Sequence, residues 1–153
     1  MTTINIDNLQ DIIDIPENTI KAIVSMVLNQ EKIHTNELTV HFVTKESISE
    51  LHNHYFNDPS PTDCISLPID SSKSPSAYKI LGDVFVCPEV AQEYAQEHSL
   101  DPIQEIFLYV IHGILHLVGY DDIKKSDRKI MRKKEKQYMG LIKEKHLDNP
   151  NAS

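Results

Sequence analysis

Two histidines stand four residues apart in the longest apolar stretch of the chain, which includes the sequence HGILHLVGYDD from His112 to Asp122. Residues four apart in a helix differ by about 40° in direction and one turn in height, so His112 and His116 direct both rings toward one point. Gly119 lets the chain reverse at the helix end, and Asp122 follows three residues later. Two imidazole nitrogens and one carboxylate oxygen suit a catalytic zinc ion, which keeps a fourth coordination position open. The spacing therefore predicts a metal site formed by His112, His116 and Asp122.

Packing is the alternative explanation, because two histidines at this spacing in an apolar helix can belong to no site at all. Two observations favour the metal. Unprotonated imidazoles beside such an apolar surface need partners, and a cation with acceptors around its ligands supplies them. The pattern H-x-x-x-H-x-x-G-x-x-D also has the spacing of zinc metalloproteases whose third ligand follows a glycine turn. We therefore expect one bound cation, with zinc as the first choice and another divalent transition metal as the alternative.

Gly113 argues against peptide hydrolysis. Metalloproteases of this spacing have a glutamate directly after the first histidine as the general base, and this chain has glycine there. A bound cation lowers the pKa of water to about 7, so a metal-bound water could still act as nucleophile without that base. Glu105, Asp121 and Asp63 are carboxylates that could relay a proton, and surface or capping roles explain them equally well. The predicted reaction class is hydrolysis, with the protease as the least favoured form.

The elements around this motif predict a mixed α/β domain. Apolar periodicity predicts helices at 16–31, 45–55, 88–99, 101–118 and from 126 onward, and alternation predicts short strands at 3–6, 37–43, 62–68 and 82–87. This order is typical of an α+β fold with a single small mixed sheet of about four strands and five or six helices, and with a zincin-like metal helix. Asp101 is expected to cap that helix, in a capping box with Gln104.

Length and composition predict one domain. The chain of 153 residues is 40% hydrophobic and 25% charged, which fits a single metal-dependent hydrolase domain over 1–147 and a disordered tail over 148–153. The apolar segment 106–120 is too short to cross a bilayer. The N-terminus has neither the basic stretch nor the apolar block of a secretory signal. Cys64 and Cys87 form no disulfide framework, so we expect a cytoplasmic protein.

Charge is unevenly distributed along the chain. The net charge of −8, taken alone, argues against a polyanionic partner. Residues 124–145, however, contain ten of the fifteen Lys and Arg residues and only three acids, so one basic helix belongs to an otherwise acidic chain. A solvated helix face is the ordinary explanation of such a run. A surface that faces phosphates is the alternative, and composition does not decide between the two.

The motif HGILHLVGYDD, with PTDCISLP and GDVFV upstream, resembles the YbeY family of bacterial endoribonucleases, whose pattern is H-G-x-L-H-L-x-G-Y-D-H. The likeness extends over most of the chain, and the motif matches at every fixed position except the last. The resemblance implies a zinc-dependent hydrolase of single-stranded RNA that acts in maturation of the 16S rRNA 3′ end and in ribosome quality control. It implies rRNA and the ribosome or its small subunit as partners, with neither membrane nor DNA.

Two positions depart from the family pattern. The resemblance puts the zinc ligands on the two histidines of the motif and on Asp122, where the family usually has histidine. Aspartate is a competent ligand, so we expect a site with altered affinity or metal preference. Phe56 stands where the family has the arginine of a Tyr-Arg pair, and a phenyl ring cannot hold a phosphate. This change is expected to reduce activity unless Lys73 or Lys79, in or beside the Ser-rich loop, binds the substrate instead.

These observations lead to three hypotheses. The first is a zinc-dependent endoribonuclease in which His112, His116 and Asp122 hold the ion and its bound water attacks a phosphodiester. The second is a ribosome-assembly binding protein that contains the metal and has weakened catalysis, as the changes at positions 56 and 122 would allow. The third is a metalloprotease. The basic run at 124–145 fits the first two, since each needs a surface for rRNA.

Overall fold

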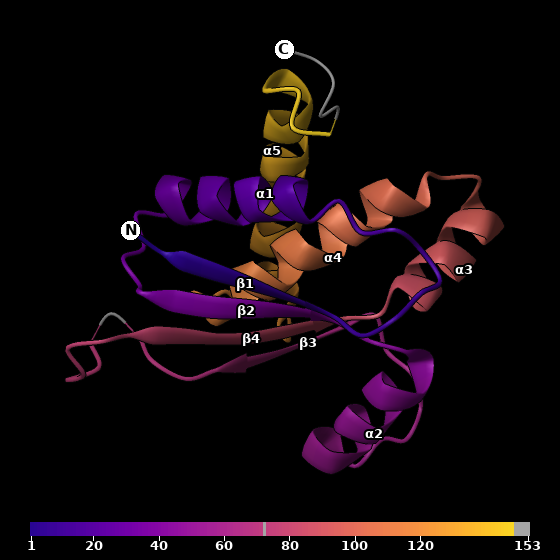
Figure 1. The fold of residues 1–153 in the computed structure, drawn as a ribbon, viewed down its shortest axis with the longest axis horizontal. Helices are drawn as coiled ribbons and strands as arrows, with labels where there is room; N and C mark the ends of the chain where they lie inside the picture. Colours follow the sequence, from indigo (N-terminus) through magenta and orange to yellow (C-terminus); the bar gives the residue numbers. More distant parts are fainter. Residues whose placement is uncertain (72, 149–153) are drawn as a thin grey trace.

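The computed structural model describes residues 1–71 and 73–148, and this part contains four strands and five helices (Figure 1). The strands are β1 (Thr3–Asn8), β2 (Glu37–Phe42), β3 (Cys64–Pro68) and β4 (Ile80–Val86). The helices are α1 (Glu17–Gln30), α2 (Lys45–Phe56), α3 (Pro88–His98), α4 (Pro102–Leu117) and α5 (Lys125–Glu144). Every helix and strand expected from the sequence is present, with bounds that differ by a residue or two.

The four strands form one mixed sheet in the order β1-β2-β4-β3. β1 and β2 are parallel, β2 and β4 are parallel, and β3 runs antiparallel to β4 at the edge. The pairing places Cys64 opposite Val86 and Pro68 opposite Gly82. The predicted α+β fold with a small mixed sheet is therefore confirmed.

The helices lie on both sides of the sheet, with α1, α4 and α5 on one side and α2 on the other (Figure 1). α4 packs on β3 and β4 and also contacts α1, α3 and α5, so it lies at the centre of the helical layer. α2 lies on the other side of the edge strand, where Ile48 shares a small apolar cluster with Ile65 of β3. The main core joins α1, α4 and α5 to the inner face of the sheet, and it includes Ile23, Ile111 and Tyr138. This packing fixes α4, and with it the histidine pair, against the edge of the sheet.

The first turn of α4 has the predicted cap but not the predicted capping box. The Asp101 side chain accepts a hydrogen bond from the backbone N–H of Ile103 at 2.9 Å. The Gln104 amide instead donates to Asp148 at 3.2 Å, so the box was a wrong prediction. Apart from Asp148, the tail predicted at 148–153 lies outside the described residues.

Within the described residues, no helix combines the length and the apolar character that a membrane crossing needs.

Candidate metal and substrate site

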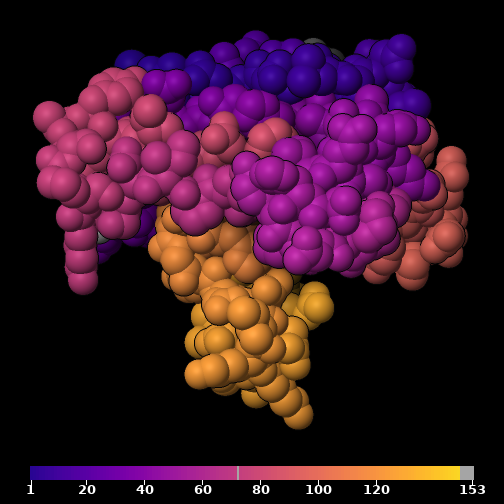
Figure 2. All heavy atoms as spheres, turned by 90° about the horizontal axis from the view of Figure 1, so that it is seen from below, coloured from indigo at the N-terminus to yellow at the C-terminus, as the bar shows by residue number. Residues whose placement is uncertain are grey.

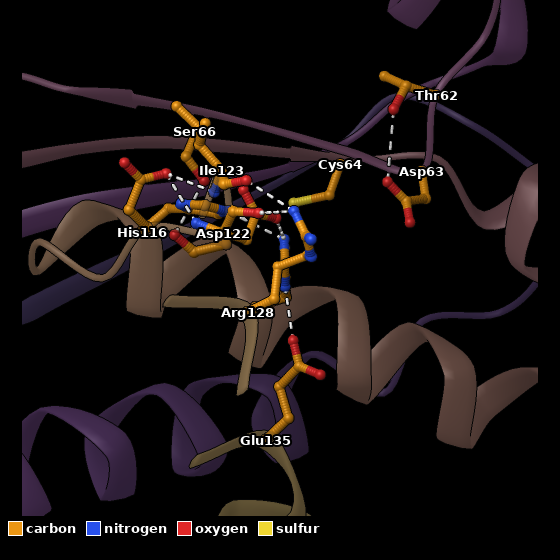
Figure 3. Close-up of polar contacts among 12 residues, drawn as sticks. Thr62, Asp63, Cys64, Ser66, His116, Asp122, Ile123, Arg128 and Glu135 are labelled. Atoms are coloured by element: carbon orange, nitrogen blue, oxygen red, sulfur yellow. Dashed lines mark hydrogen bonds and ion pairs between the residues drawn. The ribbon is translucent and has the colours of Figure 1, made fainter. Parts of the chain in front are cut away.

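Three ligand atoms from the end of α4 and the loop after it meet at one point. Figure 3 labels two of these residues, His116 and Asp122, which lie side by side. The Nε2 atoms of His112 and His116 are 3.0 Å apart, and they lie 3.5 and 3.4 Å from Oδ2 of Asp122. A tetrahedral zinc ion with bonds of about 2.0–2.1 Å needs ligand atoms about 3.3 Å apart. The triangle of these three atoms therefore fits such an ion. The three side chains are 26%, 26% and 40% exposed, which leaves an approach open to solvent.

A tight turn brings Asp122 back toward the histidines. Gly119 has φ +112°, a value that L side chains rarely adopt, and it lets the chain reverse after α4. The Asp121 carboxylate then accepts hydrogen bonds from the backbone N–H groups of Asp122 and Ile123, at 2.7 and 3.2 Å. Arg128, in the first turn of α5, donates to the Ile123 carbonyl at 2.6 Å. Asp121 thus shapes the turn, which explains its presence without a role in proton relay.

Glu135 of α5 orients His112. Its Oε2 lies 2.6 Å from Nδ1 of His112, and the glutamate is only 9% exposed. If Nδ1 carries the proton and donates it to the carboxylate, the Nε2 lone pair of His112 faces the other two ligand atoms. Burial opposes protonation of the ring, but the hydrogen bond and charge of Glu135, with the charges of Asp122 and Asp63, outweigh it and raise the pKa of His112.

Sequence reasoning missed Glu135, although a signal was present. Glu135 falls on the same stripe of α5 as the buried residues Met131, Tyr138 and Ile142, which recur at intervals of three and four residues. A carboxylate inside an apolar stripe needs a partner, because an unpaired buried charge is costly. That requirement points toward a cation or a histidine on the helix that α5 covers.

Replacing Glu135 by Gln is expected to weaken zinc binding by about 10- to 100-fold, because the imidazole then loses the charged acceptor that holds its orientation. Competition with a chromogenic chelator measures this affinity. Glu144→Gln is the matched control, since Glu144 is an exposed glutamate at the end of the same helix. Equal zinc affinities of the two variants would contradict the positioning role of Glu135.

Two hollows open on the ligand cluster, and both are lined by Asp63, His112 and Asp122. The first, here called the α5 hollow, has a volume of about 370 Å³ and is also lined by Tyr94, Arg128 and Arg132, among others. The second, the α2 hollow, has a volume of about 420 Å³ and is also lined by His52, Phe56 and Ser66, among others. In Figure 2 the orange segment that leads into α5 projects between the pink region around β3 and the magenta α2.

The structure places the other residues singled out from the sequence as follows. Phe56 is 58% exposed and lines the α2 hollow, so this position is at the site and supplies no cation. Lys79 lines a separate hollow with Leu117 and Val118, and Lys73 lies in the loop between β3 and β4. Neither lysine lines the two hollows at the ligand cluster. Substrate binding by them stays a prediction.

The carboxylates that could relay a proton, and Cys64, also differ in whether they line the two hollows. Asp63 lines both hollows. Glu105 lines neither; it is buried beside Tyr109, and this burial raises its pKa. Cys64 lines the α2 hollow, but its thiol donates to the Tyr109 carbonyl at 3.5 Å and burial raises its pKa. Of these groups, only the Asp63 carboxylate lines both hollows, and its Oδ1 accepts a hydrogen bond from the Thr62 hydroxyl at 3.4 Å (Figure 3).

Comparison with known proteins gives a consistent result. The sequence profile of the family described as Endoribonuclease YbeY matches residues 5–143. The Endoribonuclease YbeY of Protochlamydia amoebophila is 44% identical over 144 residues, which cover 94% of this chain and 95% of that protein. The Endoribonuclease YbeY of Chlamydia caviae is 39% identical over 144 residues, 92% of this chain and 91% of that protein. The solution structure of TM1509 from Thermotoga maritima, at 24% identity, matches the fold with a TM-score of 0.66 over 99% of this chain and 96% of that one.

Proposed function

Since the chain belongs to the YbeY endoribonuclease family, we propose that it is a metal-dependent endoribonuclease that cleaves single-stranded RNA during maturation of ribosomal RNA. The observation that carries the proposal is the meeting of three ligand atoms, 3.0 to 3.5 Å apart, within the family motif at the end of α4 and in the loop after it. The two hollows beside this cluster give a strand room to lie across it.

Zinc is the proposed cofactor, held by His112, His116 and Asp122. Two imidazoles and one carboxylate, with one open position, are a donor set of catalytic zinc sites. A cation bound there lowers the pKa of a coordinated water to about 7 and polarises a phosphoryl oxygen. Asp122 is a harder ligand than histidine, so we also propose that the site accepts other divalent transition metals more readily than a site with three histidines would.

The residues of the chain have distinct parts in this reaction. His112 is held in place by Glu135 at 2.6 Å, so the ligand geometry exists before substrate binds. Asp63 lines both hollows and is the carboxylate that we assign to accept a proton from the attacking water. The exposed side of the cluster receives the scissile phosphate, whose strand extends into the α2 and α5 hollows.

The cellular location, the cleavage site in the RNA and the partner are part of the same proposal. We place the activity in the bacterial cytoplasm, at the 3′ end of 16S rRNA and in ribosome quality control, with the small ribosomal subunit as partner. The family description names an endoribonuclease, and the basic character of α5 supports contact with rRNA, because a dense set of cations favours a polyanionic partner.

The proposal predicts that cleavage depends on bound metal. Protein purified without added ions is expected to contain about one equivalent of zinc and to cut a single-stranded RNA oligonucleotide. Removal of the ion with a chelator should stop cleavage, and added zinc should restore it, because the ligand cluster then has its cation again. Metal analysis and gel-resolved cleavage of the same samples measure both. Cleavage that continues unchanged in the chelator-treated protein would contradict the proposal.

A second candidate function is that of a metal-containing binding protein for ribosome assembly with weakened catalysis. The observation that favours it is the lining of the α2 hollow, where Phe56 is present and no described residue is Lys or Arg. Zinc-loaded protein that binds single-stranded RNA without cutting it would favour this second function. A metalloprotease is not proposed, because Gly113 packs so closely on the sheet that a glutamate has no room there.

A further inference from the structure

We propose that Arg128 and Arg132 of α5 bind the backbone phosphates of the RNA strand in the α5 hollow, beside the ligand cluster. This inference rests on the proposed function and names the residues through which that site holds its substrate. It assigns the two hollows different parts, because one has two guanidinium groups and the other has none.

The position of both arginines follows from the helical repeat. Residues 128 and 132 are four apart, so they lie on one face of α5. The same face contains Met131, which is buried, and Glu135, which bonds His112. The contacts that hold α5 on α4 therefore also aim this face at the ligand cluster, and both arginines line the hollow together with His112.

Arg132 is available for a ligand. It is exposed, and across residues 1–71 and 73–148 its side chain makes no hydrogen bond, ion pair or ring contact. Arg128 donates through one nitrogen, Nη1, to the carbonyls of Ile123 and Asp122, at 2.6 and 3.4 Å. Its other guanidinium N–H groups remain for a ligand, because the group has five donors in a planar fork.

The ligand is best understood as phosphate. The remaining charged residues that line the α5 hollow are the carboxylates Asp63, Asp122 and Glu135. These carboxylates would repel a polyanion, so a phosphate can be held in this hollow only through the two arginines. Arg128 and Arg132 are the only Lys or Arg side chains of the described residues that line either hollow, and a guanidinium matches two phosphate oxygens at once. Tyr94 is 43% exposed at the same hollow, and one face of its ring stacks on His98 with the centroids 4.0 Å apart, so its other face is the one on which an unpaired base would stack.

The rest of the basic helix points elsewhere. Lys134 is bound to Glu31 at 3.1 Å, on the side of α5 that faces α1. Lys129 and Lys133 are exposed and do not line the α5 hollow. They follow the two arginines by one residue each, which turns them by about 100° around the helix. This pair is therefore a control of equal charge, equal spacing and different direction.

The experiment compares Arg132→Ala and the double variant Arg128→Ala/Arg132→Ala with Lys129→Ala/Lys133→Ala, all as zinc-loaded full chains. Binding of a fluorescein-labelled single-stranded RNA is measured on ice by anisotropy at several salt concentrations, and a gel confirms that the RNA is intact. The Kd is expected to rise about tenfold for Arg132→Ala and further for the double variant, with KM rising accordingly in cleavage assays. The slope of log K against log salt should fall by about 0.7 for each phosphate that the variant no longer neutralises.

The outcomes separate this inference from the proposed function. The lysine pair should change Kd less than the arginine pair, and equal losses in the two pairs would overturn the inference, since charge alone would then explain binding. Wild-type affinity in Arg132→Ala would overturn it as well, because among the described residues this side chain has no polar partner whose loss could confuse the result. A chain that binds RNA through the arginines without cutting it would support the inference and count against the nuclease.

Discussion

Replacement of His112 by alanine is expected to remove both zinc and the cleavage of single-stranded RNA while the chain stays folded. The imidazole provides one of three ligand atoms, so a site with only two cannot retain the ion at ordinary zinc concentrations. The activation that a bound cation supplies is worth several kcal/mol, and we therefore expect the rate to fall by about 10³-fold or more. Metal analysis, a cleavage assay and circular dichroism of the same preparation measure the three effects.

Two further variants make this result specific. His116→Ala should lose zinc and activity equally, but among the described residues the His116 ring has polar and ring contacts with His112 and Asp122 alone, so Glu135 keeps its partner. His112→Ala leaves that buried carboxylate unpaired and should be the less stable of the two by about 1–3 kcal/mol. His34→Ala is the control, since His34 is exposed and lines another hollow. If His112→Ala cut RNA as fast as the wild type, the activity would come from a contaminant or from another site.

The local parts of the site were predictable from the sequence because they are close in the chain. His112, His116 and Asp122 lie within eleven residues, and helical geometry with a glycine turn is enough to bring them together. The periodic apolar pattern likewise predicts α4 and its neighbours, since each helix buries a regular stripe. These predictions need no knowledge of how distant segments meet.

The long-range parts were not predictable, because they depend on how packed elements meet. Glu135 reaches His112 only because α5 crosses α4 at the angle that the core imposes. The same crossing determines that, of the ten basic residues at 124–145, Arg128 and Arg132 line the α5 hollow. The edge position and antiparallel direction of β3 follow from pairing with β4, which no local pattern in 64–68 specifies. This pairing also sets where the chain around Lys73 and Lys79 leaves the sheet, and neither lysine lines the two hollows, so substrate binding by them stays a prediction.

Substitution of Gly113 by glutamate is expected to unfold the chain and not to create a protease. A Cβ atom at this position would overlap Cγ1 of Val84 and lie 3.0 Å from Sγ of Cys64. Val84 is fully buried and branched, so it cannot turn away. A carboxylate forced into this contact has no partner, and its burial costs several kcal/mol. Since domains of this size are stable by about 5–15 kcal/mol, we expect loss of the cooperative unfolding transition in thermal scans.

Gly113→Ala gives a graded form of the same test. Overpacking of a tight contact costs about 1–3 kcal/mol, and the better helix propensity of alanine returns up to about 1 kcal/mol. We therefore expect a net loss of about 1–2 kcal/mol in urea unfolding. The hydrogen bond from Ser66 to the Gly113 carbonyl, at 2.8 Å, ties this turn of α4 to β3, so the helix cannot simply slide away. A shift here also moves His112, and zinc affinity should fall together with stability.

Gly140→Ala separates the steric overlap from the propensity, because an added Cβ at Gly140 in α5 has no other atom within 4 Å. It should be neutral or stabilise the chain by up to about 1 kcal/mol. A second comparison shortens the side chain that the new Cβ would overlap. In a Val84→Ala background, Gly113→Ala should lower the free energy of unfolding by less than it does in the wild type, and the difference measures the overlap. If Gly113→Ala behaved like Gly140→Ala in both backgrounds, α4 would not lie against β4 at this point. The glycine would then need another explanation, and the case against the glutamate of a protease would lose its physical basis.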